Sequence, residues 1–195
     1  MHFPTDIVLA SGSPRRQSIL SEMGISFEVI LHEINEDFPV TLKGSEVALF
    51  LANKKALAYD KEVESGKTVI TADTIVCIHN EILNKPGNVS DAFTMLKSLS
   101  GKTHEVITAV CIRNKKQTNS FATTTKVTFK ELSDEEIDYY IETCKPFDKA
   151  GGYGIQEWIG MIGITAIEGS YYNVVGFPAH EVYTNLIQMA EHISS

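Results

Sequence analysis

The chain has 195 residues, of which 43% are hydrophobic and 22% charged, values typical of a globular protein that is long enough to bury a core. Its formal net charge of -8 and its pI near 5.2 argue against binding to nucleic acid polymers, although a local basic pocket for a small anion remains open. No apolar run approaches the roughly 20 residues that span a bilayer, so no membrane segment is expected.

The cysteines indicate a reducing compartment. Cys77, Cys111 and Cys144 are odd in number, widely spaced and without a C-x-x-C pair. This usage is typical of reduced, mostly buried thiols in a cytoplasmic protein, rather than of disulfides or a zinc site. Residues 1–8 show no basic region followed by an apolar stretch, so no signal peptide is apparent.

The first elements in chain order are a strand, a helix and a second strand. Residues 7–10 form an apolar run typical of a buried strand. The helix that follows has Ser13 as its predicted N-cap, Pro14 in its first turn and Gly24 at its end. Residues 27–31 predict the second strand, which leads into a polar loop.

The middle of the chain repeats this alternation. A helix capped by Ser45 is predicted next, and its expected core positions are Val47, Leu49, Phe50, Leu51, Ala56 and Leu57. Residues 68–78 are rich in β-branched side chains and predict one strand or two around Asp73. Residues 90–99 predict another capped helix, which is closed by Gly101.

Long strands open the second half. Residues 104–112 and 120–130 predict consecutive strands. Ser133 begins a capping box, S-D-E-E, and its helix is expected to end before Pro146.

The C-terminal part begins with the glycine-rich residues 148–156, which predict a loop. Two strand-like pieces flank Gly169, and a last helix is expected from about Ala179 to Ile193. Alternation of strands and helices throughout predicts an α/β architecture.

The first candidate site is the stretch from Ser11 to Arg16. A strand that enters a small-residue turn before a helix offers free backbone N–H groups, and Arg15 and Arg16 add forked donors suited to phosphate. The alternative is an ordinary turn with a good cap and two solvated arginines.

Asp73 is the second candidate, because it interrupts an apolar run and needs a partner, a metal or a cleft. A carboxylate there can hold Mg²⁺ or accept a proton from water. The alternative is a strand-end aspartate bonded to nearby backbone or to an arginine. Glu36 and Asp37 lie in a polar loop, where solvated side chains are the simpler interpretation.

Basic residues elsewhere could complete an anion site. Each of these basic residues by itself is more simply explained as a charge exposed to solvent, but together with Arg15 and Arg16 they could neutralise a triphosphate. They are Lys54, Lys55, Lys85 and Lys149. Structural roles are expected for His104 and His180.

Seven stretches occur in the order seen in one known family. They are LASGSPRR, ANKKA, ADTIV, LNKP, LSGKTHEVITAV, DKAGGYGIQ and GSYYNVVGFP. On these motifs, which cover residues 7–178, the chain resembles the Maf proteins. The resemblance implies a cytoplasmic nucleoside-triphosphate pyrophosphatase that is linked to arrest of septum formation. It also implies an inosine-triphosphatase-like α/β fold, with a mixed twisted sheet flanked by helices and two lobes around a cleft. We expect residues 1–195 to form a single Maf-like domain.

The resemblance also implies site residues. Asp73 matches the family's proton acceptor, and Glu36 matches an acidic position near a divalent metal, Mg²⁺ or Mn²⁺, that Asp73 would share. The positions that match the phosphate side are Ser11, Arg15, Arg16, Lys55 and Lys85. The partner implied is a nucleoside triphosphate, with no nucleic acid polymer and no membrane, and a homodimer is suggested.

Arg15, Thr74 and Gln156 match the specificity positions of the branch that resembles dTTP/UTP pyrophosphatases. Two departures are Trp158, where relatives often have a small residue, and the missing basic residue before Ile167. Two other functions stay open: a nucleotide-sensing regulator of division that acts by binding a partner, and the same reaction on another triphosphate.

Overall fold

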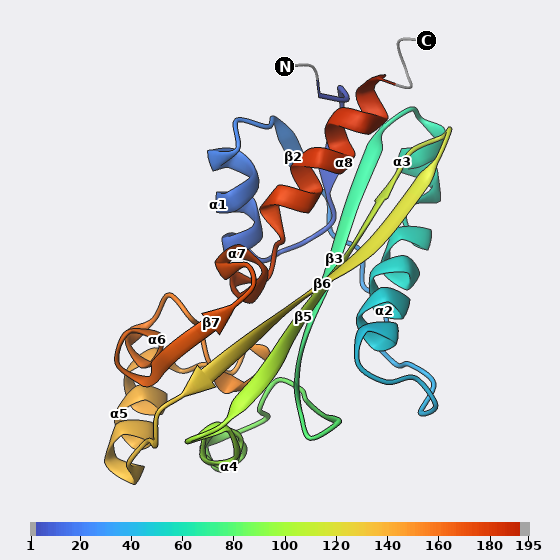
Figure 1. Cartoon of the computed structure of the whole chain (residues 1–195). Coiled ribbons are helices and arrows are strands. Elements are labelled where there is room, and N and C mark those ends of the chain that lie inside the picture. The colour runs from blue at the N-terminus through green and yellow to red at the C-terminus, as the bar shows by residue number, and fades with distance from the viewer. Residues whose placement is uncertain (1–2, 192–195) are drawn as a thin grey trace. The chain divides into compact units, whose positions relative to one another are not determined.

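The computed structural model describes residues 3–191 of the chain. A mixed sheet runs in the order β2-β1-β3-β5-β6-β7, with β4 paired to β3 (Figure 1). Its strands are β1 (Ile7–Leu9), β2 (Phe27–Val29), β3 (Thr68–Ile78), β4 (Glu81–Leu83), β5 (Thr103–Arg113), β6 (Thr118–Phe129) and β7 (Ile164–Glu168). The α/β prediction is therefore confirmed.

The helices follow the strands along the chain, as Figure 1 shows. They are α1 (Pro14–Glu22), α2 (Ser45–Leu57), α3 (Asp60–Glu64), α4 (Val89–Leu99), α5 (Asp134–Cys144), the 3-10 turn η1 (Ala150–Gly152), α6 (Trp158–Gly163), α7 (Tyr171–Val175) and α8 (Ala179–Glu191). Residues 192 and 193 of the expected last helix lie outside the described part. No helix within residues 3–191 is long and apolar enough to cross a membrane.

The contacts of the chain define two compact units. The first comprises residues up to Asp73, Thr108–Thr123 and the residues from Gly176 onward. The second comprises Thr74–Ile107 and Thr124–Val175.

In the first unit, β1 pairs in parallel with both β2 and β3, with Ile7 opposite Phe27 and Thr68. The strand β1 is fully buried, which explains its short run of purely apolar residues. A cluster of Val8, Tyr59, Val63 and Val69 packs beside it.

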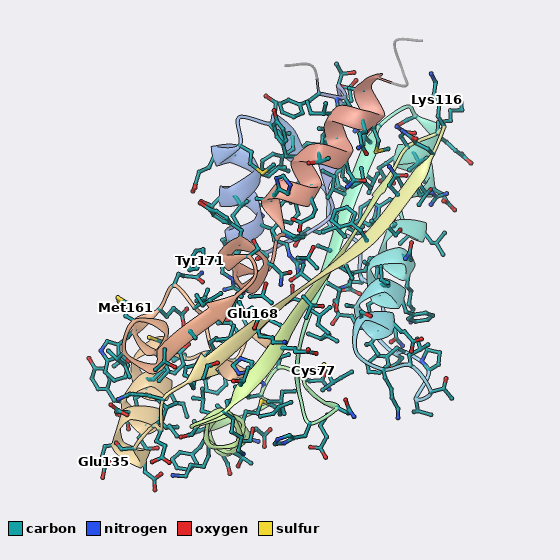
Figure 2. The ribbon with its side chains drawn as sticks, viewed as in Figure 1. Cys77, Lys116, Glu135, Met161, Glu168 and Tyr171 are labelled. Carbon is teal, nitrogen blue, oxygen red and sulfur yellow. The ribbon has the colours of Figure 1, made fainter. Side chains whose placement is uncertain are left out.

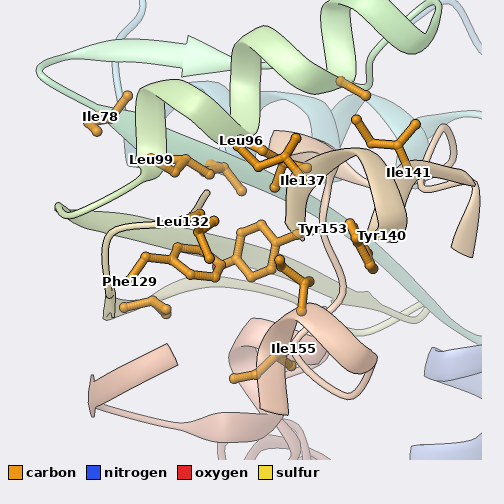
Figure 3. Close-up of a cluster of buried hydrophobic side chains, with 14 of the residues drawn as sticks. Ile78, Leu96, Leu99, Phe129, Leu132, Ile137, Tyr140, Ile141, Tyr153 and Ile155 are labelled. Atoms are coloured by element: carbon orange, nitrogen blue, oxygen red, sulfur yellow. The ribbon is translucent and has the colours of Figure 1, made fainter. Parts of the chain in front are cut away.

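The second unit has its own hydrophobic core, and Figure 3 shows its side chains. Leu96 and Leu99 of α4 pack with Ile137 and Tyr140 of α5 in this cluster. The cluster also includes Phe129, Leu132, Tyr153 and Ile155.

Helix starts are only partly as predicted. The capping box is confirmed, because Ser133 Oγ accepts from the Glu136 N–H while Glu136 accepts from the Ser133 N–H. Ser13 occupies the N-cap position of α1, but its side chain makes no capping bond. Ser45 is the first helical residue of α2 rather than its cap, and α4 is capped by Asn88.

One further prediction is wrong and another is only partly right. Only one strand, β7, adjoins Gly169, because the stretch after it forms the helix α7; Figure 2 labels Glu168 at the end of that strand and Tyr171 at the start of the helix. The helix α2 buries Val47, Ala48, Leu51, Ala52 and Ala56, whereas Phe50 and Leu57 are exposed. The buried face of α2 therefore combines three alanines with Val47 and Leu51, and Phe50 and Leu57 lie on the other side.

His104 has a structural environment, as expected. It lies on β5, is 2% exposed, and stacks on Phe129 with ring centroids 5.6 Å apart. Its Nε2 lies 2.7 Å from Tyr153 Oη. Burial lowers the pKa of His104 from 6.5 to about 4, because the charged imidazolium is desolvated.

We predict that this histidine makes the protein acid-sensitive. Between pH 6.5 and about 4 the unfolded chain binds a proton at His104 that the folded chain does not. The free energy of unfolding should therefore decrease by roughly 3 kcal/mol as the pH is lowered through this range. Denaturant unfolding of His104→Phe should show a lower starting stability and a flatter pH dependence. The exposed His180→Gln serves as control and should retain the wild-type slope; an equal slope in His104→Phe contradicts the prediction.

Candidate active site

Asp73 lies on β3 and faces α2. Two residues earlier on the same face of the strand, the Thr71 hydroxyl donates to the Ala52 carbonyl oxygen of α2 at 2.7 Å. Lys55 follows Ala52 by one helical turn, so its side chain leaves the same side of the helix. The periods of the strand and the helix together bring Lys55 to Asp73.

The Lys55 ammonium joins two carboxylates. Its Nζ lies 2.6 Å from Asp73 Oδ1 and 2.7 Å from Glu36 Oε1. Asp73 is only 8% exposed, whereas the Glu36 side chain is 51% exposed. A buried carboxylate needs such a partner, because removing its charge from water is otherwise costly.

Glu36 lies on a segment without helix or strand, residues 30–44, that is fixed at several points. The Tyr59 hydroxyl donates to the Ile30 carbonyl oxygen at 3.0 Å. Beside Glu36, the Asp37 carbonyl oxygen accepts from Lys54 Nζ at 2.8 Å. Lys54 therefore binds this segment of the protein, and Lys55 is the lysine that reaches the buried carboxylate.

Arg16 closes the turn between β1 and α1. Its Nε donates to the Gly176 carbonyl oxygen at 2.8 Å, and its Nη1 donates to Ser11 Oγ at 3.2 Å. The same Nη1 donates to the Ala72 carbonyl oxygen at 2.8 Å, one residue before Asp73. The interpretation of Arg16 as a solvated arginine is thus wrong, because the guanidinium attaches the turn to the strand that carries the carboxylate.

The charges of this region act on one another. Burial lowers the pKa of Arg16 from its ordinary value; Asp73 opposes that shift, Arg15 adds to it, and Glu36 opposes it. Arg15 itself is half-buried. The structure therefore brings Ser11, the two arginines, Glu36, Lys55 and Asp73 into one electrostatic environment within the first unit.

The other candidate residues belong to the second unit. Thr74 follows Asp73 on β3, and successive strand residues face opposite sides, so its side chain leaves the other face. Lys85 follows β4 and Gln156 precedes α6, and both are exposed.

Lys149 differs from the solvent-facing charge expected of it. It is 8% exposed, and its Nζ lies 2.7 Å from Asp148 Oδ1 and 3.0 Å from Glu157 Oε1. Glu157 also accepts a hydrogen bond from the Tyr140 hydroxyl. Sequence reasoning missed Tyr140 and Glu157, although the position of Glu157 directly after Gln156 was a signal that could have been used.

Comparison with known proteins decides the family. The model of the Maf family, described as Maf-like protein, matches residues 6–189. The chain belongs to the Maf family. The resemblance carried by the seven sequence stretches is thereby confirmed.

Maf relatives of this chain carry a common name. A protein of Flavobacterium psychrophilum named dTTP/UTP pyrophosphatase is 53% identical over 183 residues, covering 94% of each chain. One of Phocaeicola vulgatus with the same name is 54% identical over 181 residues, covering 92% of this chain and 94% of the relative. The solved structure of a HAM1 protein from Coxiella burnetii covers 94% of this chain and 98% of its own, at 12% identity and a TM-score of 0.47. A TM-score of that size adds no weight to the assignment.

We predict that Arg16 stabilises the folded state of this Maf chain in the absence of any ligand. Arg16→Ala leaves the Ser11 hydroxyl and the carbonyl oxygens of Ala72 and Gly176 without these donors, which should lower the free energy of unfolding by about 2–3 kcal/mol. Chemical denaturation measures the change. Lys61→Ala, at an exposed cation of α3, should stay within about 0.5 kcal/mol of wild type, and equal stability of both variants would contradict the role given to Arg16.

Proposed function

We propose that this protein hydrolyses dTTP and UTP to the nucleoside monophosphate and pyrophosphate. The observation that carries the proposal is the Lys55 ammonium held by Asp73 and Glu36, with the Arg16 turn bonded to the residue before Asp73. The names of the Maf relatives supply the substrates.

The reaction needs a base and cations. The oxygen of a water molecule attacks the α-phosphorus, the bond from that phosphorus to the oxygen bridging to the β-phosphorus breaks, and pyrophosphate leaves with the bonding pair. Asp73 takes the proton of the attacking water. It is suited to this because it is nearly buried and its backbone is fixed within the strand β3.

Cationic and polar side chains would bind the phosphate oxygens. We assign this role to Ser11, Arg15, Arg16, Lys55 and Lys85, as the family pattern implies. Lys55 exchanges contact with the carboxylates for contact with phosphate as substrate enters. Arg16 also supports the site without a phosphate ligand, because its hydrogen bonds hold Ser11 and the backbone beside Asp73 in place.

The acidic pair fits a divalent cation that the Maf family implies. The oxygens of Glu36 and Asp73 converge on one ammonium, which marks a point where positive charge is favoured. No group of three or more His, Cys, Asp or Glu residues within the described residues could hold a metal by itself. Mg²⁺ is commonly bound by one or two carboxylates together with substrate phosphates, so Glu36 and Asp73 would hold Mg²⁺ or Mn²⁺ with the triphosphate. Such an ion neutralises charge on the phosphates.

Base choice is assigned to Arg15, Thr74 and Gln156. The exposed amide of Gln156 can donate and accept, which suits the carbonyl and N–H groups of uracil or thymine. We further propose that the chain works in the cytoplasm as one domain, and as a homodimer.

Measurement of pyrophosphate release tests the proposal. Wild-type protein is offered dTTP, UTP, CTP, ATP, GTP and modified triphosphates, with Mg²⁺, with Mn²⁺ and with chelator. Preference for dTTP and UTP that is lost with chelator is expected. Binding of these nucleotides without turnover would instead support a nucleotide-sensing regulator.

Asp73→Asn should keep the fold but lower kcat by about 10²-fold or more, the scale expected for a lost general base. The amide keeps the shape of the side chain, so a thermal melt should show a folded protein. Asp138→Asn, an exposed change on α5, provides the control and should leave kcat unaltered. Normal turnover in folded Asp73→Asn would remove Asp73 from the mechanism.

Gln156→Ala should reduce the preference for UTP over GTP more than it reduces turnover. A site built to bond a base rejects one that leaves its polar groups unpaired, and alanine removes those groups. The measurement is kcat/KM for UTP and GTP in both proteins. An unchanged ratio with lower activity on both nucleotides would show that Gln156 only braces its loop.

A further inference from the structure

The segment Lys149–Glu157 is closed by an ion pair between its own ends. Lys149 Nζ lies 3.0 Å from Glu157 Oε1, and Lys149 is 8% exposed. Asp148 supplies a second carboxylate at 2.7 Å from the same nitrogen. Because Lys149 is nearly buried, its charge needs these carboxylates, and its pair with Glu157 holds the two ends of the segment together.

Tyr140 of α5 binds the same segment at two points. Its hydroxyl donates to Glu157 Oε2 and accepts from the Gly154 N–H at 3.0 Å. The ring is fully buried in the core of the second unit, where Figure 3 labels it. Burial, together with the bond to Glu157, raises the pKa of Tyr140, so the hydroxyl remains a donor.

The segment has little freedom to shift elsewhere. The Gly151 N–H donates to the Asn84 carbonyl oxygen at 3.2 Å, one residue before Lys85. Gly151 has a φ of +69°, and a Cβ there would lie 3.0 Å from side-chain atoms of Val76. At Gly154 a Cβ would lie 2.8 Å from the Glu157 carboxyl carbon. Backbone and carboxylate thus approach as closely as glycine allows.

Gln156 stands directly before Glu157 and is exposed, whereas Lys149 and Tyr140 are buried and Glu157 is half-buried. We propose that Tyr140 and Glu157 are positioning residues for substrate choice: together with Lys149 they fix the backbone of Lys149–Glu157 and so present the Gln156 amide to a pyrimidine base. The inference rests on the proposed function, and it extends that function to residues that do not touch the substrate.

A matched pair of variants separates positioning from general stability. Tyr140→Phe removes the hydroxyl and keeps the buried ring. Tyr139→Phe makes the same chemical change one residue earlier, at a side chain that is 51% exposed and packs edge-on against Trp158. Glu157→Gln keeps the shape of the carboxylate but removes its charge, while Asp148 remains beside Lys149.

The first readout is activity, measured well below the melting temperature of each variant. In Tyr140→Phe and Glu157→Gln we expect KM for UTP to rise about tenfold, the scale of one hydrogen bond lost with its partner left buried, while kcat changes little. Activity on GTP should change less, so the ratio of kcat/KM for UTP to that for GTP falls. Tyr139→Phe should match wild type.

The second readout is hydrogen–deuterium exchange of the nucleotide-free proteins. Amides of residues 149–157 should exchange faster in both test variants than in wild type and Tyr139→Phe, because the Gly154 N–H and the ends of the segment lose their anchors. Unaltered exchange there overturns the proposal. So does an equal loss of activity on UTP and GTP, which a purely structural role would produce.

Failure of the proposed function can be distinguished from failure of the positioning proposal. If wild type releases pyrophosphate from no triphosphate, the function is wrong, and binding of UMP and GMP by calorimetry replaces kinetics. A selective loss of UMP affinity in Tyr140→Phe would still support positioning, whereas equal affinities in both tyrosine variants would overturn it.

Discussion

The contact between the Lys55 ammonium and the carboxylates of Asp73 and Glu36 is the constraint on which the candidate site depends. Asp73 is nearly buried on β3, and a charge there persists only with a partner. The partner comes from α2, which the bond from the Thr71 hydroxyl to the Ala52 carbonyl oxygen connects to the same strand. Glu36 then fixes an otherwise irregular segment over the same lysine. The contacts that place α2 therefore also determine the surroundings of the Asp73 carboxylate.

The sequence allowed prediction of those parts of the fold and of the site that depend on local pattern. Asp73 stood out because it breaks an apolar strand, and the capping box at Ser133 was readable from spacing alone. The inner face of α2 was only partly predicted, since Phe50 and Leu57 were assigned to the core while Ala48 and Ala52 were not. Which side of α2 faces the core is decided by its tertiary packing, including the bond from Thr71 to the Ala52 carbonyl oxygen, and local pattern does not contain that information. The burial of Lys149 was missed for a similar reason: it depends on Glu157, whose carboxylate is bound by Tyr140 of α5.

Charge is distributed unevenly between chain and site. The chain carries a net charge of -8, yet Arg15, Arg16 and Lys55 are gathered around two acids in the first unit. Each cation there is partly withdrawn from water, so its field is less screened than that of a surface lysine. An acidic exterior with such a local basic site discourages long polyanions while it leaves room for a small one. The bonds of Arg16 to Ser11 and to the Ala72 carbonyl oxygen keep this arrangement in place before any ligand arrives.

The strand that carries Asp73 also limits how the sequence can change length. On β3, Thr71 and Asp73 face α2 while Thr74 leaves the opposite side, and the register with β1 is set by Ile7 opposite Thr68. A single residue inserted between Thr68 and Asp73 would reverse the face of everything after it, so the carboxylate would lose Lys55 although every side chain were still present. Substitution can therefore adjust this protein gradually, whereas insertion or deletion within the strand acts all at once. Natural variation in length should therefore fall outside β3, and attempts to remodel the enzyme should keep the residue count of that strand fixed.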